Sequence, residues 1–275
     1  MTYLELFNKL KEINKDTYLD EIIYEFIYDE CVFDLLTFIE FRHKFKKDYK
    51  KVINKFQKVI NNKIPWERIL KYCYFLNLKI KLNKNVFSPR KDTEFLVNSF
   101  LVDNPNLKNK TILDLGTGSG CISLAIACNI DSSNLIVGYE NNNKAIKNTL
   151  INFKNYNKKI KLIKKDYLKC IVQNKLINSD YIICNPPYIN QNYQLDNNVI
   201  KYDPKSALFS NDDEIKYYKR IIEYFNKQIN IKKLYFEIGY NQKQLLIDFL
   251  NDFKNLKYEF KQDLNNVDRV LIVSR

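Results

Sequence analysis

The sequence predicts an α/β protein in which a small N-terminal bundle of helices precedes a seven-stranded, mostly parallel sheet with helices on both faces. Residues 1–78 predict the bundle, because they contain no glycine, a single proline and apolar residues at the spacing of four or five short helices. Residues 91–275 predict the sheet, because apolar strand-like runs there alternate with helix-compatible segments. The final strands, 256–261 and 268–274, are too close in the chain for a crossover helix, so the last strand is expected to be antiparallel.

The remaining elements follow from the same patterns. A small hairpin is expected over residues 80–88, where apolar residues flank the turn-forming Asn83-Lys84-Asn85, and it would link regions 1–78 and 91–275 through residues 79–90. A helix over 91–102 opens the larger region, and residues 188–211, which show no clear period, are expected to form a loop. The other predicted elements are strands at 111–115, 134–139, 160–163 and 180–184 with helices between them, a helix at 212–228, a strand at 233–238 and a helix at 240–251.

The chain is strongly basic, with 45 Lys and Arg against 32 Asp and Glu and a formal net charge of +13. Such a charge is compatible with nucleic-acid binding. However, only six of the basic residues are arginine, the lysines are scattered, and Lys, Asn, Ile, Tyr and Phe all have AT-rich codons. We therefore expect no specific nucleic-acid recognition from charge alone.

The cysteine and histidine content excludes several kinds of site. The six cysteines include no Cys-x-x-Cys pair and mostly lie in apolar segments, which predicts buried free thiols in a reducing cytoplasm. His43 is the only histidine, so no histidine-based zinc site and no Ser-His catalytic pair is expected. No signal peptide is visible, and no apolar run reaches the ~18 residues that span a membrane. A soluble, cytoplasmic, metal-free protein is therefore expected.

A glycine loop follows the strand predicted at 111–115. Its sequence is Gly116-Thr117-Gly118-Ser119-Gly120, and it holds three of the five glycines in the chain. A strand, a glycine turn and a helix in that order are typical of the first half of a nucleotide-binding βαβ unit. The next strand ends in Glu140, which is placed to accept hydrogen bonds from ribose hydroxyls, and Asp166 and Tyr167 after the third strand are placed to meet an adenine. A NAD site follows the same logic and is the competing interpretation.

Asn185-Pro186-Pro187-Tyr188 ends the apolar run 181–184. Two prolines can neither pair in a sheet nor continue into a helix, so the strand stops there in a stiff loop. The loop offers an amide side chain, the carbonyl of Pro186 and an aromatic face, which together suit a planar NH₂ group. A simple strand-ending turn is the alternative.

These motifs point to a known family. Asp114 with the glycine loop resembles motif I of class I S-adenosylmethionine-dependent methyltransferases, and Pro89-Arg90-Lys91-Asp92-Thr93-Glu94 resembles the Pro-Arg-Pro-Asp-Thr-Glu signature of the HemK/PrmC family. This family comprises the protein-(glutamine-N5) methyltransferases of peptide-chain release factors. Further matching segments, in order, are 114–120, 185–189, 202–208, 237–240 and 263–270. The chain departs from the pattern at Lys91, which replaces a proline, around residues 65–69, and at 230–233, where a Gly-Gly turn is absent.

The resemblance implies a class I methyltransferase fold, S-adenosylmethionine as cofactor, release factors as the protein partner and substrate recognition by the helical region. It implies that the cofactor is contacted by Asp114, Gly116, Thr117, Gly118, Ser119, Gly120, Glu140, Asp166, Tyr167 and Asn185. It assigns catalysis, by orientation of a glutamine side chain, to Asn185, Pro186, Pro187 and Tyr188, and substrate binding to these four together with Ile189, Arg90 and Glu94. Residues 90–94 would shape the mouth of the pocket or, alternatively, form a helix N-cap through Asp92 or Thr93.

Two other functions stay open at this point. An adenine-N6 or guanine-N2 methyltransferase of DNA or RNA would use the same Asn-Pro-Pro-Tyr loop, because an exocyclic amine presents the same chemical problem as an amide. A non-catalytic binding protein that has kept the fold is the second alternative. Nothing in the sequence demands more than a monomer.

Overall fold

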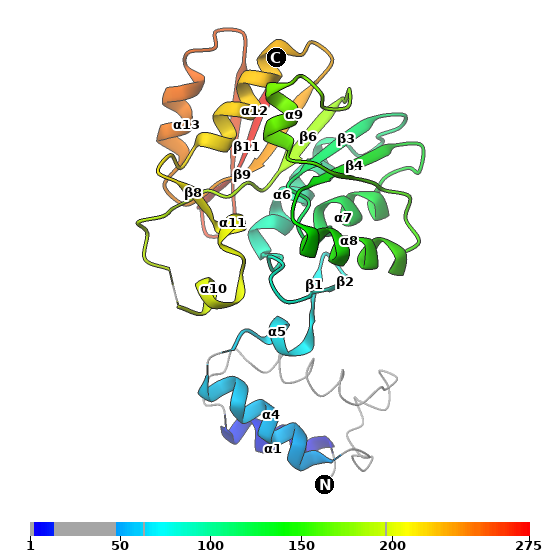
Figure 1. Cartoon of the computed structure of the whole chain (residues 1–275), viewed down its shortest axis with the longest axis vertical. Helices are drawn as coiled ribbons and strands as arrows, with labels where there is room; N and C mark the ends of the chain where they lie inside the picture. The colour runs from blue at the N-terminus through cyan, green and yellow to red at the C-terminus, as the bar shows by residue number, and fades with distance from the viewer. Residues whose placement is uncertain (1–2, 14–47, 63, 196) are drawn as a thin grey trace. The chain divides into compact units, whose positions relative to one another are not determined.

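A computed structural model describes residues 3–13, 48–62, 64–195 and 197–275. The chain forms two compact units, Met1–Lys71 and Tyr72–Arg275 (Figure 1). The helices predicted between residues 14 and 47, together with Cys31 and His43, lie outside the described residues.

The first unit contains three described helices, Tyr3–Ile13 (α1), Tyr49–Asn61 (α4) and Trp66–Leu70 (α5). Asp48 caps α4, because its side chain accepts a hydrogen bond from the backbone N–H of Lys50. The apolar faces of α1 and α4 form a small core of buried side chains: Leu6, Phe7, Leu10, Val52, Ile53 and Phe56. The helical periodicity of the sequence is confirmed for these segments.

The second unit opens with an antiparallel hairpin of Tyr72–Phe75 (β1) and Leu78–Lys81 (β2). The prediction of a hairpin over 80–88 is wrong. Leu76 and Asn77, both with positive φ, make the two-residue turn that closes it, and this pair carries a weaker turn signal than Asn83-Lys84-Asn85. The later turn does form at Asn85, but the residues after it run on as irregular backbone into the next helix.

The main sheet of the second unit has seven strands in the order β10-β11-β9-β6-β3-β4-β5 (Figure 1). In that order they are Lys257–Gln262, Asp268–Ser274, Lys233–Glu237, Tyr181–Cys184, Thr111–Leu115, Leu135–Glu140 and Lys161–Lys164. The last strand, β11, is antiparallel to both of its neighbours, and the pairings among β9, β6, β3, β4 and β5 are parallel. The predicted fold class is therefore confirmed.

Helices cover both faces of the sheet. The helices are Lys91–Asp103 (α6), Cys121–Asn129 (α7), Asn143–Asn155 (α8), Tyr167–Val172 (α9), Lys216–Lys227 (α12) and Lys243–Leu250 (α13). Side chains of α6, α7 and α8 form one buried cluster, and those of α9, α12 and α13 form the other. Neighbouring residues of β3 alternate between these clusters, Ile112 in one and Leu113 in the other, as the pleat of a strand requires.

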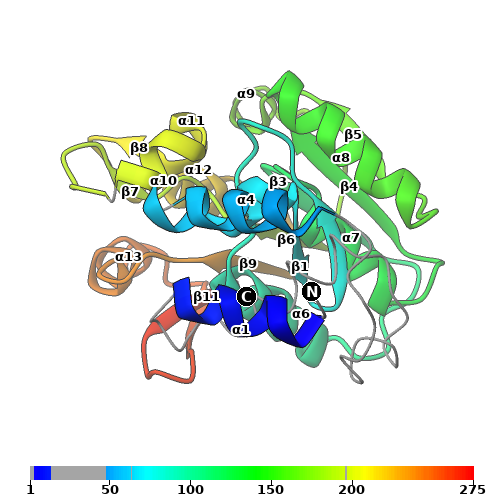
Figure 2. The same cartoon turned by 90° about the horizontal axis from the view of Figure 1, so that it is seen from below.

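The segment expected to be a loop contains four short elements: Ile189–Asn190 (β7), Asn197–Tyr202 (α10), Lys205–Leu208 (α11) and Phe209–Asn211 (β8). Strands β7 and β8 pair in parallel, and the yellow-green segment they bracket lies beside the main sheet (Figure 2). None of these elements is long enough to show a period in the sequence. Within the described ranges, no helix is long and apolar enough to cross a membrane.

The strand order places a crevice at the centre of the sheet. From β3 the chain passes to β4 on one side, and it later returns to β6 on the other. In open α/β sheets, ligands bind at such a reversal, outside the carboxyl ends of the strands. A ligand site is therefore expected at the loops that follow β3, β4 and β6.

Candidate active site

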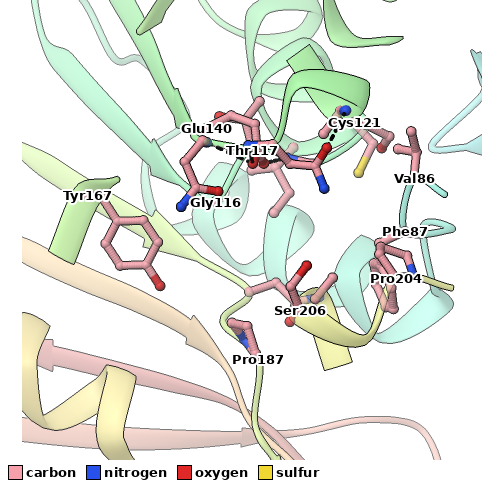
Figure 3. Close-up of a pocket in the computed structure, with 18 of the residues that line it drawn as sticks. Val86, Phe87, Gly116, Thr117, Cys121, Glu140, Tyr167, Pro187, Pro204 and Ser206 are labelled. Carbon is pink, nitrogen blue, oxygen red and sulfur yellow. Dashed lines mark hydrogen bonds between the residues drawn. The ribbon is translucent and has the colours of Figure 1, made fainter. Parts of the chain in front are cut away.

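A cavity of about 240 Å³ lies at the carboxyl ends of β3, β4 and β6. Figure 3 shows Glu140 and the glycine loop on one side of this cavity, and Pro187, Pro204 and Ser206 across from them. The predicted site residues that line it are Gly116, Thr117, Gly118, Ser119, Glu140, Asp166, Tyr167, Asn185 and Pro187. The structure thus brings together most of the residues that the sequence separates by up to seventy positions.

The glycine loop wraps one end of the cavity because three of its residues adopt positive φ: Gly116, Gly118 and Gly120. At Gly120, with φ +86°, a Cβ atom would also lie 2.9 Å from side-chain carbons of Phe153 and Thr149. Only glycine satisfies both constraints there. Gly120 is the N-cap of α7 and is not among the residues that line the cavity, so it shapes the loop rather than the wall.

Glu140 ends β4 and ties it to the glycine loop. Its Oε2 accepts a hydrogen bond from the N–H of Gly118 at 2.8 Å, and its Oε1 accepts from the N–H groups of Asn141 and Asn142 at 2.9 and 2.8 Å. An ionised carboxylate has about four acceptor positions, so one remains for a ligand hydroxyl. Glu140 is therefore a fixed acceptor on the cavity wall.

Asp114 is placed differently from its neighbours in the motif. Its side chain is fully buried and is not among the lining residues. Its Oδ2 accepts hydrogen bonds from the N–H and hydroxyl of Ser123 in α7, whereas Oδ1 is buried without a hydrogen-bond partner. Burial raises the pKa of Asp114 to about 7, although the bonds from Ser123 oppose that change. In this structure Asp114 anchors the glycine loop to α7, and its predicted cofactor contact stays a prediction.

We expect Asp114→Asn to weaken the pH dependence of stability. Because the folded-state pKa is raised, the stability from this group is complete below about pH 4 and is lost as the pH rises through about 7. The parent should lose roughly 2–3 kcal/mol of unfolding free energy from this group between about pH 5 and about pH 8. Urea unfolding at both pH values measures it, with the exposed Asp252→Asn as control. A variant with the parent's full pH dependence would contradict the assignment.

Asp166 and Tyr167 form another part of the wall, next to the glycine loop. Asp166 caps α9, since its Oδ1 accepts hydrogen bonds from the N–H groups of Leu168 and Lys169. The Tyr167 ring lies next to the glycine loop, 3.7 Å from where a Cβ atom on Gly116 would be. Its hydroxyl is buried beside the Cys184 thiol, and burial raises its pKa well above the ordinary value. The neutral phenol ring, rather than the hydroxyl, is thus the part of Tyr167 that a ligand in the cavity would meet.

A second cavity of about 210 Å³ adjoins the first and shares Phe87, Asn185 and Ala207 with it. Its remaining lining residues are Arg90, Tyr188, Ile189, Val199 and Leu208. Four predicted substrate-binding residues, Asn185, Tyr188, Ile189 and Arg90, therefore meet in this cavity. Asn185 borders both cavities, which is the position needed by a group that joins a cofactor to a substrate.

Two predicted residues lie elsewhere. Glu94 is not among the described residues lining either cavity, and its Oε1 accepts hydrogen bonds from the backbone of Leu76 and from Lys91. Pro186 is likewise absent from both linings, although it lies between Asn185 and Pro187. The substrate roles of Glu94 and Pro186 stay predictions.

The alternative of an N-capping box at 90–94 is wrong. The N-cap of α6 is Arg90, and no side-chain hydrogen bond caps the helix. Asp92 instead forms an ion pair with Arg269 at 3.3 Å, and the Thr93 hydroxyl donates to Glu237 at 2.6 Å. Both side chains are therefore used in tertiary contacts with β9 and β11.

Glu237 was not predicted as a site residue, and Thr93 was predicted only as part of the segment 90–94 at the pocket mouth, yet both hold the Asn-Pro-Pro-Tyr loop. Asn185 Nδ2 donates to Thr93 Oγ1 at 3.1 Å, and the Tyr188 hydroxyl donates to Glu237 Oε1 at 3.2 Å. The Glu237 side chain is 1% exposed, and its burial raises its pKa to about 7. In the sequence, the signal for Glu237 was that it is an acidic residue near the end of the apolar strand 233–238, within the matched segment 237–240.

The loop is rigid and leaves acceptors available. Among the described residues, no donor reaches Asn185 Oδ1, whereas Nδ2 is engaged by Thr93. Gln242 holds the other end of the loop by donating to the carbonyl of Tyr188 at 2.9 Å. The arrangement can therefore accept hydrogen bonds from an NH₂ group held between the two cavities. Orienting that NH₂ group in this way requires no titratable base in contact with its nitrogen.

Comparisons with known proteins identify the family of this chain. The family model "Methyltransferase small domain" matches residues 77–204. The release factor glutamine methyltransferase of Thermodesulfovibrio yellowstonii is 31% identical over 78% of this chain and 77% of its own length. The protein of the same name from Mycoplasma mycoides is 28% identical over 99% of this chain and 98% of its own length.

A solved structure shares the fold. The hMettl16 catalytic domain, solved in complex with the MAT2A 3′UTR hairpin 6, superposes with a TM-score of 0.53 over 72% of this chain and 75% of that one. The sequence identity is 14%, so the likeness concerns the fold alone.

Proposed function

The chain belongs to the release factor glutamine methyltransferase family, and from this premise we propose that it transfers a methyl group from S-adenosylmethionine to the side-chain amide nitrogen of the glutamine in the Gly-Gly-Gln motif of peptide-chain release factors. The observation that carries the proposal is the 31% identity to a release factor glutamine methyltransferase over 78% of the chain. The position of Asn185 between two adjoining cavities supports it.

The first cavity fits the cofactor. When bound, S-adenosylmethionine supplies an electrophilic methyl group. The glycine loop, Glu140, Asp166 and Tyr167 would hold it, and Asn185 would border it. The fit rests on a backbone turn that needs glycine, on a carboxylate with one unused acceptor position, and on the aromatic ring of Tyr167 beside the glycine loop.

The second cavity fits the glutamine side chain. An amide nitrogen is a poor nucleophile because its lone pair is delocalised into the carbonyl. Asn185 Oδ1 and the carbonyl of Pro186 would accept its two N–H bonds, and the Tyr188 ring would pack on the amide plane. These contacts direct the nitrogen lone pair toward the first cavity. Orientation of this kind lowers a barrier by up to ~7–11 kcal/mol. The added proton is acidic and leaves to water, so no dedicated base is needed.

The remaining parts of the proposal concern the partner. The helical unit Met1–Lys71 would bind the release factor, and a monomer would suffice because residues of this chain supply the groups that the proposed transfer uses. Release factors act on ribosomes, so the proposed activity belongs in the cytoplasm.

The test is methyl transfer to purified release factor. With the enzyme and isotope-labelled S-adenosylmethionine, we expect mass spectrometry to find one added methyl group on the glutamine of the Gly-Gly-Gln segment. A release factor with glutamate at that position is the matched control and should stay unlabelled. Label in tRNA, rRNA or DNA, with release factor blank, would instead support the exocyclic-amine methyltransferase.

A further inference from the structure

One buried carboxylate holds both ends of the Asn-Pro-Pro-Tyr loop. Glu237 Oε2 accepts a hydrogen bond from Thr93, which in turn accepts one from Asn185, and Glu237 Oε1 accepts from Tyr188. Thr93 and Glu237 are 2% and 1% exposed; Thr93 lines the first cavity, and neither residue lines the second. Glu237 thus contacts Tyr188 directly but reaches Asn185 only through Thr93.

The single proton of the Thr93 hydroxyl sets the direction of this chain of hydrogen bonds. An ionised carboxylate only accepts, so the Thr93 proton must point to Glu237. Thr93 can then only accept from Asn185, which must present its NH₂ group to Thr93. We propose that Glu237, acting through Thr93, fixes the orientation of the Asn185 amide so that its oxygen faces the substrate amide. This inference rests on the proposed function, and it makes Glu237 and Thr93 positioning residues.

A proton on Glu237 would remove the constraint. The carboxyl group could then donate to Thr93, and Thr93 could donate to Asn185 Oδ1. The Asn185 amide would be turned, and its NH₂ group would face the NH₂ group of the substrate, where neither can accept. A buried polar group left without its partner is costly, so the turned state should not bind the substrate amide productively.

The surroundings of Glu237 raise its pKa so far that its carboxylate can take up this proton near neutral pH. Burial raises its pKa to about 7; the hydrogen bond from Thr93 and the charge of Arg269 lower it, and the charge of Asp92 raises it further. Burial keeps the Tyr188 and Tyr218 phenols and the Cys184 thiol neutral, because it raises each pKa well above its ordinary value. The groups that face Glu237 are therefore Thr93, Tyr188, Asp92, Arg269, Cys184 and Tyr218, whose hydroxyl donates to its backbone carbonyl.

The first test is kinetic, at saturating cofactor and release factor. The parent kcat should rise through about pH 7, where Glu237 ionises. Thr93→Val should lower kcat at about pH 8 by about tenfold and remove this rise, whereas Thr93→Ser, which keeps a hydroxyl, should retain both. Glu237→Gln should lower kcat similarly and give a flat profile. The Kd of the cofactor should stay within several-fold of the parent in all three.

The second test does not need turnover. The side-chain amide signal of Asn185 can be identified in a nitrogen-15 NMR spectrum, because Asn185→Ala removes it. In the parent and in Thr93→Ser it should shift with a midpoint near pH 7, and in Glu237→Gln it should not shift there. An Asn185 signal without that midpoint, or a Thr93→Val enzyme with the parent's kcat and profile, would overturn the inference. A parent that leaves release factor unmethylated but shows the NMR midpoint would contradict the proposed function and leave the inference standing.

Discussion

Asn185→Ala is expected to lower kcat by about 100- to 1,000-fold, the loss typical of removing one preorganised hydrogen-bonding group from a catalytic site. The side chain borders both cavities, and its Oδ1 has no donor among the described residues. Alanine removes the acceptor that would orient the substrate amide. The glycine loop and Glu140, which would hold the cofactor, do not depend on it. Cofactor affinity should therefore stay within several-fold of the parent, as measured by calorimetry.

Asn190→Ala is the matched control for this experiment. Asn190 lies just after this loop, in β7, but lines neither cavity, and its Oδ1 accepts a hydrogen bond from the N–H of Asn192. It should keep nearly the parent's kcat. Equal turnover in Asn185→Ala and parent would refute the orienting role, and a loss of cofactor binding in Asn185→Ala would move that role to the first cavity.

The sheet of the larger unit could be predicted because its central strands β3, β4, β6 and β9 are mostly buried. All four residues of β6, Tyr181–Cys184, are buried, which is why they appear as a continuous apolar run in the sequence. The antiparallel last strand followed from chain length alone, since the segment between β10 and β11 is too short for a crossover. Such features depend on residues that are neighbours in the sequence, so the folding of the rest of the chain does not change them.

The errors fall where local signals compete. The hairpin forms at Leu76-Asn77 because Phe75 and Ile80 are buried against the main core, a tertiary effect that outweighs the stronger turn signal at Asn83-Lys84-Asn85. The helix predicted at 212–228 begins at Lys216, because residues 212–215 form a turn in which the Asp213 carboxylate accepts a hydrogen bond from the N–H of Ile215. The position of the hairpin thus depends on residues distant in the sequence, and the start of the helix depends on the turn before it.

The site residues also divide into those that the local sequence predicts and those that only the folded chain brings together. Glu140 and Asn185 were predictable because each ends a parallel strand, and carboxyl ends of parallel strands share one edge. The contact between Thr93 and Glu237 joins residues 144 positions apart and has no local pattern. The Asp203 carboxylate similarly accepts hydrogen bonds from the backbone of Ser88 and from Arg90, and so joins two segments of the cavity walls. Folding alone brings these groups together.

Glu140→Ala is expected to raise the Kd of the cofactor by at least about 100-fold. In the proposed complex the remaining acceptor position of the carboxylate takes a ribose hydroxyl, and a hydrogen bond to a charged acceptor contributes about 1.5–3 kcal/mol. The substitution also leaves the N–H groups of Gly118, Asn141 and Asn142 without their acceptor, which loosens the glycine loop. Calorimetric titration with S-adenosylhomocysteine measures the affinity without any turnover, and thermal unfolding checks that the variant is folded.

A second ligand distinguishes the two causes of the weaker binding by Glu140→Ala, which are the missing hydrogen bond to the ribose and the loosened glycine loop. An S-adenosylhomocysteine analogue without the ribose 2′-hydroxyl should bind the parent more weakly, by about tenfold or more. It should bind Glu140→Ala almost as well as the complete ligand does, because the acceptor for that hydroxyl is already missing. If the analogue lost the same factor in both proteins, Glu140 would act only by shaping the loop. If Glu140→Ala bound the complete ligand as tightly as the parent does, the first cavity would not be the nucleoside site, whatever Asn185→Ala does to turnover.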